Sequence, residues 1–255
     1  MTDKPSVDKS PENVAGMFAD IAPRYDFMNR FLSGFVDVYW RKYTAKRVPI
    51  PQGGSYLDVC TGTADLLIEY YRRYKDKASA YVGCDFCQPM LDIGEKKIQK
   101  KIPQPAVPVT LQFGDACALP FEDNSFDTIT VAFGLRNTTD MTKAIQEMHR
   151  VCKPGGTMGI LEFSMPTGFF FKRLYLFYFR YILPILGKIL ARNRYKAYNY
   201  LPQSVESFPY GQELADALAQ CGWQNVTFTP LTFGIATLYI GTKEQNRHNN
   251  HLKIS

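Results

Sequence analysis

The stretch Leu57-Asp58-Val59-Cys60-Thr61-Gly62-Thr63-Ala64-Asp65-Leu66 decides the fold of this chain of 255 residues. Its first part closes a short apolar strand that we expect over residues 55–60, and its last part opens a helix rich in Leu, Ile and Tyr. The small residues between them make a turn whose backbone can approach a ligand. In an open parallel sheet, ligands bind at such strand-to-helix turns. The stretch therefore predicts an α/β fold with a binding site at its first turn.

The composition of this turn limits the ligand that it can accept. Phosphate-binding turns read G-x-G-x-x-G or G-x-x-x-x-G-K-[ST], and neither pattern is present here. Asp58 and Asp65 would also repel a pyrophosphate group. A positively charged ligand fits better, with Asp58 and the backbone of Gly62 as candidate contacts. The alternative from these ten residues alone is a tight turn that serves packing only.

Strands and helices alternate outward from this turn. Apolar runs bounded by turn residues predict further strands over residues 80–84, 109–113, 128–133 and 157–163, with helices over 89–101 and 141–151. This spacing indicates a parallel sheet covered on both faces. After a basic, aromatic insertion at 167–200, we expect a helix over 212–220 that ends at Gly222, and then an antiparallel hairpin of strands 226–231 and 235–242.

We expect one domain over residues 10–243, between a disordered tail at 1–9 and a polar tail at 244–255. Its first part, residues 10–47, is a helical preface to the α/β pattern. Ser10 is the expected N-cap of a first helix, with Pro11 in its first turn and Pro23 ending it. A second helix is expected from Asp26 to about Arg47.

Composition excludes several classes of protein. Hydrophobic residues make up 45% of the chain and charged residues 21%, which excludes a disordered chain, a collagen-like fibre and a coiled coil. The six cysteines lack the spacing of a disulfide framework, and the first sixteen residues lack the apolar core of a secretion signal, so a reduced, cytosolic compartment is expected. Two of the three histidines lie in the polar tail, and no metal site is expected.

The formal net charge of +6 comes from one basic segment. Between Phe163 and Val205 there are seven Lys and Arg residues, interleaved with aromatic side chains, and no Asp or Glu. The uncharged runs are too short to span a bilayer, so residues 168–200 are predicted to lie on an anionic membrane surface. A homodimer interface and an internal hydrophobic helix are the alternatives. The segment lacks the pattern of an RNA-binding module, and no nucleic-acid partner is expected.

Acidic residues close three successive strands. Asp85 follows Asp58 by 27 residues, at a position where a carboxylate can accept hydrogen bonds from both ribose hydroxyls of a nucleoside. Gly114-Asp115-Ala116 follows the third strand and can meet an adenine edge. A nucleoside with a positive centre satisfies all three positions. S-adenosylmethionine, whose sulfur carries a positive charge, is the natural candidate.

Four further stretches carry a resemblance to a known family. They are Asp123-Asn124-Ser125-Phe126-Asp127, Phe133-Gly134-Leu135-Arg136-Asn137, Glu162-Phe163-Ser164 and Pro202-Gln203-Ser204-Val205. With them, the chain resembles the ubiquinone/menaquinone-biosynthesis C-methyltransferase family, which has the class I S-adenosylmethionine-dependent fold. The resemblance covers nearly the whole chain and leaves out only the two tails.

This resemblance implies a mostly parallel, Rossmann-like sheet of seven strands, and S-adenosylmethionine as the methyl donor. By position, Thr63 lies in the first turn, Asp85 at the ribose, and Asp115 with Ala116 at the adenine. Ala132 stands where some members have a serine that touches the cofactor, so we expect it only to line the site. Thr61 and Ala64 stand where glycines are usual, and their side chains are expected to narrow the pocket.

The implied reaction is methyl transfer to a ring carbon of a polyprenyl quinol. Deprotonation of a ring hydroxyl spreads negative charge to the neighbouring carbon, so the site must favour the phenolate. Arg136 is the candidate to stabilise that oxyanion or to position a water as base, Asn137 to orient the ring, and Tyr25 to close the site. A salt bridge at a helix start is the alternative role for Arg136, and packing is the alternative for Tyr25.

Demethylmenaquinol is the expected substrate, and the methoxy-benzoquinol precursor of ubiquinone is equally compatible with the motifs. Such a substrate predicts a cytoplasmic protein that associates peripherally with the inner face of the membrane. Two other functions stay open at this point. One is a different small-molecule methyltransferase, such as one that acts on a lipid amine, and the other is a non-catalytic scaffold that binds quinone lipids.

Overall fold

The computed structural model describes residues 10–166, 168, 173, 200 and 203–245. The predicted tail at 1–9, all but the first two residues of the predicted tail at 244–255, and nearly all of the predicted insertion at 167–200 lie outside the described residues. No helix in the described part of the chain is long and apolar enough to cross a membrane.

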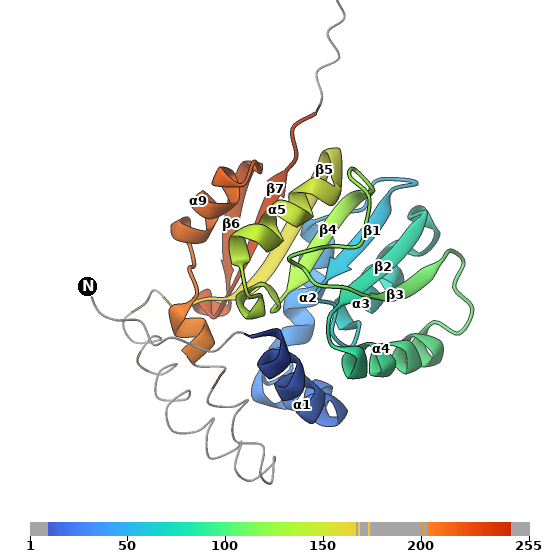
Figure 1. The fold of residues 1–255 in the computed structure, drawn as a ribbon, viewed down its shortest axis with the longest axis horizontal. Coiled ribbons are helices and arrows are strands. Elements are labelled where there is room, and N and C mark those ends of the chain that lie inside the picture. Colours follow the sequence, from blue (N-terminus) through green and yellow to red (C-terminus); the bar gives the residue numbers. More distant parts are fainter. Residues whose placement is uncertain (1–9, 167, 169–172, 174–199, 201–202, 246–255) are drawn as a thin grey trace, which may run out of the picture.

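A seven-stranded sheet forms the centre of the described structure, in the order β3-β2-β1-β4-β5-β7-β6 (Figure 1). Its strands are β1 (Ser55–Val59), β2 (Ala80–Asp85), β3 (Val109–Phe113), β4 (Phe126–Ala132), β5 (Cys152–Phe163), β6 (Gln224–Leu231) and β7 (Ala236–Thr242). The first five strands are parallel, and β7 runs antiparallel between β5 and β6. The predicted fold class, including the final antiparallel hairpin, is confirmed.

Two neighbouring strands, β4 and β5, begin earlier than predicted. β5 begins at Cys152, five residues earlier than expected, because Cys152 already pairs with Phe126 of β4 across an irregularity in the register. For the same reason β4 begins at Phe126 rather than Thr128. The Lys153-Pro154-Gly155-Gly156 run therefore lies within an irregular strand and does not form a separate turn.

Helices cover both faces of the sheet, and each face has its own hydrophobic core. On one face α5 (Met141–Val151) and α9 (Gln212–Gln220) pack against Leu57, Ile129 and Ile160. On the other, α2 (Val36–Arg47), α3 (Asp65–Tyr74) and α4 (Gln88–Lys101) enclose Tyr56 and Tyr81. Short 3-10 helices occur at η1 (Lys75–Lys77), η2 (Leu135–Asn137) and η4 (Thr232–Gly234).

The helical preface differs from the prediction in where it breaks. Pro23 lies inside one continuous helix, α1 (Pro11–Leu32), and the chain turns instead at Ser33-Gly34-Phe35 before α2. A proline inside a helix removes one hydrogen bond, at a cost of about 3 kcal/mol. Here α1 packs on α4, with Ala22 in a cluster with Cys87 and Met90, and this packing offsets the loss. The left-handed Gly34, with φ of +57°, marks the true break.

Candidate active site

A pocket lies at the carboxyl ends of the parallel strands and is closed on one side by α1. Its wall includes residues that follow β1, β2, β3 and β4, together with Phe18 and Tyr25 from the preface. Seven of the ten predicted site residues line it: Tyr25, Gly62, Asp85, Asp115, Ala116, Ala132 and Asn137. The other three, Asp58, Thr63 and Arg136, are buried behind this lining.

The first turn brings its backbone close to the end of β2. Cys60, Gly62 and Ala64 all have left-handed backbone angles, with φ of +53°, +55° and +63°. This geometry directs the Gly62 N–H at Oδ2 of Asp85, 2.8 Å away. A Cβ on Gly62 would meet nothing within 4 Å, so open space lies beside this backbone. The turn therefore leaves room for a ligand, even though Thr61 and Ala64 stand where glycines were expected.

Asp85 is the buried carboxylate of the pocket. Its Oδ1 accepts a hydrogen bond of 2.9 Å from the N–H of Cys87, and its Oδ2 accepts the one from Gly62. Burial raises its pKa to about 6, against the lowering effect of these backbone donors. A carboxylate can accept about four hydrogen bonds, so Asp85 retains acceptor capacity for hydroxyl groups of a ligand.

Asp58, in contrast, holds the turn from beneath. Its two carboxylate oxygens accept hydrogen bonds from the hydroxyls of Thr61, at 2.8 Å, and Thr130, at 2.9 Å. Burial raises its pKa to about 7, against the lowering effect of the two hydroxyl donors. Thr61 thus has a structural role in this chain, because its hydroxyl ties the turn to the carboxylate under it.

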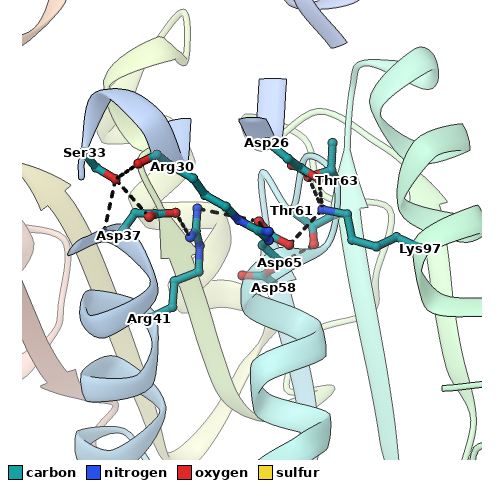
Figure 2. Close-up of polar contacts among 10 residues, drawn as sticks. All are labelled: Asp26, Arg30, Ser33, Asp37, Arg41, Asp58, Thr61, Thr63, Asp65 and Lys97. Carbon is teal, nitrogen blue, oxygen red and sulfur yellow. Dashed lines mark hydrogen bonds and ion pairs between the residues drawn. The ribbon is translucent and has the colours of Figure 1, made fainter. Parts of the chain in front are cut away.

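Thr63 joins the first turn to the preface through a charged cluster (Figure 2). Its hydroxyl bonds to Oδ1 of Asp26 on α1, at 2.5 Å, and receives a hydrogen bond of 2.8 Å from Nζ of Lys97 on α4. Lys97 also pairs with Asp26 and, at 2.8 Å, with Asp65. One ammonium group therefore bridges α1, α3 and the cofactor-side turn.

The same cluster continues toward α2 (Figure 2). Asp65 lies 3.6 Å from Arg30 and 4.0 Å from Arg41, and Arg41 pairs with Asp37, which also accepts from the hydroxyl of Ser33. Burial opposes ionisation of Asp65, but Lys97 and Arg41 outweigh it and hold its pKa below the usual value. We refer to Asp26, Lys97, Asp65, Arg30 and Arg41 as the preface cluster.

Arg136 is held in a buried ion pair on the far side of the pocket. Its Nη1 lies 2.8 Å from Oε1 of Glu162, and the two side chains are 6% and 1% exposed. The guanidinium lies 5.1 Å from the centre of the Phe163 ring, and Nη1 also donates to the carbonyl of Phe133. Its Nε is buried and has no hydrogen-bond partner within the described residues.

Asn137, from η2, and Tyr25, from α1, both line the pocket. Asn137 donates through Nδ2 to the carbonyl of Phe133, at 3.2 Å, and accepts through Oδ1 from the hydroxyl of Tyr200, at 3.1 Å. Burial raises the pKa of Tyr25, while a hydrogen bond with Asn29 and the charge of Arg136 act against the rise. Tyr25 is consequently a neutral phenol at neutral pH.

Sequence reasoning missed the apolar wall and several partners of the predicted residues. The wall contains Phe18, Phe86, Met90, Phe113 and Phe133. In the sequence these side chains are indistinguishable from core residues. Lys97 and Tyr200 were missed because their partners are 71 and 63 residues away along the chain. Glu162 gave a signal, since it stands in one of the four diagnostic stretches, but no role was assigned to it.

The pocket fits S-adenosylmethionine. Asp85 has acceptor capacity for ribose hydroxyls, Ala116 and Ala132 leave space for a flat base, and Asp115 lies at the pocket edge with its carboxylate bonded to the N–H of Cys117. Aromatic side chains and buried carboxylates favour a cationic ligand. No cluster of metal-ligating side chains occurs in the parts of the chain that the structure describes. Fold and pocket together define a class I S-adenosylmethionine-dependent methyltransferase.

Comparison with known proteins narrows the class to a family. The model of the ubiE/COQ5 methyltransferase family matches residues 6–243. The ubiquinone/menaquinone biosynthesis C-methyltransferase UbiE of Geobacter sulfurreducens is 43% identical over 91% of this chain and 89% of its own length. The demethylmenaquinone methyltransferase of Anoxybacillus flavithermus is 44% identical over 92% of this chain and 98% of its own. The chain belongs to the ubiE/COQ5 methyltransferase family.

A solved structure supports the fold independently. A methyltransferase from Thermotoga maritima, described as a possible histamine N-methyltransferase, superposes with a TM-score of 0.60 at 17% identity, over 91% of this chain and all of that one. At this identity the likeness concerns the fold alone. Taken with the family, it makes this chain an S-adenosylmethionine-dependent C-methyltransferase.

The preface cluster gives a first prediction. Replacing Lys97 by Met leaves Asp26 and Asp65 without their shared cation, so α1 should hold less firmly to the first turn. We expect the free energy of unfolding to fall by about 1–3 kcal/mol. S-adenosylmethionine should also bind more weakly, because Phe18 and Tyr25 are carried by α1. Urea denaturation and calorimetric titration measure the two effects.

The matched control is Lys96→Met, which removes an exposed lysine from the neighbouring position of α4. It should change neither quantity. A loss of stability in Lys97→Met with unchanged cofactor affinity would show that docking of α1 does not shape the pocket.

Proposed function

We propose that this chain transfers a methyl group from S-adenosylmethionine to a ring carbon of a polyprenyl quinol. The expected substrates are demethylmenaquinol and the methoxy-benzoquinol precursor of ubiquinone. The observation that carries the proposal is the meeting of two sets of groups in one pocket. Asp85, Asp115 and Ala116 stand on the side of β2 and β3, whereas Tyr25 and Asn137 stand on the side of the preface and η2.

The cofactor half of this proposal assigns a role to each group. Asp85 would accept the ribose hydroxyls, Asp115 and Ala116 would contact the adenine, and the Gly62 backbone would lie along the amino-acid end. Thr63 and Asp58 support this half from outside the lining, by fixing the turn to α1 and to β4. When bound, S-adenosylmethionine supplies an electrophilic methyl group on a positively charged sulfur.

The substrate half must make a ring carbon nucleophilic. Loss of a proton from a quinol hydroxyl creates a phenolate whose charge spreads to the adjacent carbon. That carbon forms the new bond to the methyl group as the bond between methyl and sulfur breaks. The same carbon then gives up its hydrogen as a proton to solvent, and the ring regains its aromaticity. Asn137 and Tyr25 would hold the ring hydroxyls during these steps.

Arg136 would act on this chemistry by its charge. The ion pair with Glu162 fixes the guanidinium, and Nε is left without a partner within the described residues. A fixed positive charge beside the pocket favours the phenolate over the phenol. Its field already acts on Tyr25, whose pKa burial raises and Arg136 lowers. In this proposal Arg136 takes both of the roles considered for it: it forms the salt bridge with Glu162, and its charge stabilises the oxyanion.

The substrate also implies a membrane. A polyprenyl quinol resides in the bilayer, so we propose that the protein is cytoplasmic and associates peripherally with the inner face of the membrane. The segment 168–200, basic and rich in aromatic residues, is proposed to contact anionic lipid. A homodimer interface is the competing role for this segment.

Quinone analysis tests the proposed function. The chain is expressed in a host that lacks its own enzyme, and the extracted quinones are measured by mass spectrometry. A gain of one methyl group on the naphthoquinone or the benzoquinone ring confirms the reaction and names the ring. Folded protein that binds S-adenosylmethionine but adds no methyl group to either ring would refute it and favour another acceptor, such as a lipid amine.

The buried state of Asp85 predicts a pH dependence of cofactor affinity. The ionised carboxylate accepts hydrogen bonds from ribose hydroxyls more strongly than the protonated acid does, and its pKa in the free protein is raised to about 6. Protonation below this value should weaken binding, so the dissociation constant should rise about tenfold between pH 7 and pH 5. Asp85→Asn should bind weakly and lose the part of the pH dependence that comes from Asp85, while Asp58, with a pKa of about 7, titrates in both proteins. Parent protein with the same affinity at both pH values would contradict the ribose assignment.

The role of Arg136 requires a paired substitution. Arg136→Met alone would leave the carboxylate of Glu162 buried without a cation, which costs about 3–5 kcal/mol. We therefore expect the double variant Arg136→Met/Glu162→Gln to fold and to bind S-adenosylmethionine with little change. Its turnover number should fall about a hundredfold. Glu162→Gln alone is the control that retains the guanidinium: it should be less stable, because the buried Arg136 then lacks its counterion, but it should keep most of its turnover. Equal losses of cofactor affinity and turnover in the double variant would make the role of Arg136 structural.

A further inference from the structure

The preface carries a group of exposed aromatic side chains that the proposed mechanism does not use. They are Phe27 and Phe31 on α1, Phe35 in the turn, and Tyr39 on α2, with 60%, 47%, 65% and 53% of their surface exposed. The rings of Phe27 and Phe31 stack on each other with centres 5.9 Å apart. We call these four residues the aromatic face. A group of large exposed apolar side chains in one region of a soluble protein often marks an interaction site.

The backbone at Phe35 shows that this exposure is not a by-product of packing. Phe35 has a left-handed φ of +65°, which is unfavourable for a bulky side chain and natural for glycine. Its ring gains little burial in return, since it is the most exposed of the four. The fold therefore accepts backbone strain in order to present an aromatic ring to the surroundings.

A second aromatic residue with a left-handed backbone lies in η4, far along the chain from the preface. Phe233, in η4, has a φ of +58° and is 65% exposed. Its neighbour Thr232 accepts a hydrogen bond of 2.8 Å from Nε1 of Trp40, which places η4 beside α2. Trp40 in turn packs 5.8 Å from Phe133, whose ring lines the pocket. Apolar side chains thus lead from this region to the pocket wall.

Positive charges predominate around the aromatic face, and the neighbouring Asp26 is paired with Lys97. From Phe27 to Arg47 the only acidic residue is Asp37, which is buried and paired with Arg41. Lys42 and Lys46 are exposed and follow Tyr39 by three and seven positions, so they share its side of α2. Asp20, exposed two turns before Phe27, bounds the face on α1.

We propose that the aromatic face is a lipid-contact surface that docks on an anionic membrane leaflet. Aromatic rings would enter the boundary between headgroups and acyl chains, and Lys42 and Lys46 would meet lipid phosphates. Docking in this way presents the nearby pocket wall to a quinol dissolved in that leaflet. Only the purpose of docking, which is access to a quinol in the leaflet, rests on the proposed function. Binding of the aromatic face to lipid does not require that the protein catalyses methyl transfer.

A second copy of the chain is a less suitable occupant of this surface. A two-fold symmetric interface pairs the same patch from both subunits. The exposed Lys42 and Lys46 would then approach their own copies and repel one another across the contact. An anionic leaflet matches both the sign of these charges and the apolar rings among them.

Vesicle flotation tests the proposal with the full chain. Partition is measured on vesicles of phosphatidylcholine with about a third of phosphatidylglycerol, and on phosphatidylcholine alone. The parent should bind the anionic vesicles preferentially. Phe35→Gly should weaken this binding about tenfold, and its thermal stability should not fall, since glycine adopts the left-handed backbone without strain. The pair Lys42→Gln/Lys46→Gln should also weaken binding about tenfold on anionic vesicles.

Two matched controls lie on the opposite side of the sheet, where α5 and α9 pack. Tyr210→Ser removes an aromatic ring that is 37% exposed just before α9, and Lys143→Gln removes an exposed lysine of α5. Neither should alter partition. Unchanged partition in Phe35→Gly and in the lysine pair would overturn the proposal and leave lipid binding to segment 168–200. Parent protein that fails to bind anionic vesicles would overturn it as well.

Two further readouts separate this proposal from its rivals. If sedimentation shows a parent dimer that Phe35→Gly dissociates while vesicle binding stays the same, the surface is a subunit interface and the lipid proposal fails. Methylation of a short-chain, water-soluble quinol should persist in Phe35→Gly, whereas methylation of a vesicle-embedded quinol should fall. Parent protein that binds vesicles but methylates neither quinol would refute the proposed function and leave the lipid surface standing.

Discussion

The left-handed turn after β1 is the constraint on which the site depends. Cys60, Gly62 and Ala64 bend the chain so that one backbone N–H reaches Asp85, while Asp58 holds the turn from below through Thr61. The loop after β4 packs closely against the same turn. The space beside Gly134 is so small that a Cβ built there would lie 2.3 Å from the Cβ of Cys60. Thr63 attaches the preface to it. Distortion of this turn would therefore disturb the pocket from every side.

The buried acidic groups around this turn differ in pKa, because cations lie beside one of them and not beside the others in the described structure. Within the part of the chain that the structure describes, neither Asp58 nor Asp85 has an ion pair, and burial raises the pKa of each. Asp65 is also largely buried, but Lys97 and Arg41 hold its pKa below the usual value. Only Asp85 of these three lines the pocket. The carboxylate that lines the pocket, Asp85, thus keeps capacity to accept hydrogen bonds from a ligand. Asp58 and Asp65 have their hydrogen-bond and ion-pair partners within the fold.

A water-soluble cofactor and a bilayer-dissolved acceptor impose opposite demands on this enzyme. Under the proposed function the polar strand ends would meet the first demand, and the apolar wall that includes Phe133 would meet the second. The Phe133 ring packs with those of Trp40 and Phe163, which are not part of the pocket lining, at 4.4–6.1 Å between ring centres. Helix α1 carries Tyr25 into the pocket and also carries Phe27 and Phe31 of the aromatic face. The ion pairs of the preface cluster hold α1 against α3 and α4, and thereby fix the positions of Tyr25 and of the aromatic side chains that α1 carries.

The sequence by itself determined the sheet, the first turn, the final hairpin and the pocket position of Asp85, because short apolar runs, glycines and acidic strand ends are local signals. The sequence predicted that the first helix ends at Pro23, whereas the structure ends it before Gly34. The packing of α1 on α4, which keeps the helix continuous through Pro23, cannot be seen in the pattern of a single helix. Only the tertiary structure decided which acids face the pocket, that Arg136 pairs with Glu162, and that Lys97 joins α1 to the first turn. Each of these contacts joins residues that are distant in the chain, and their geometry exists only once the strands and helices have packed.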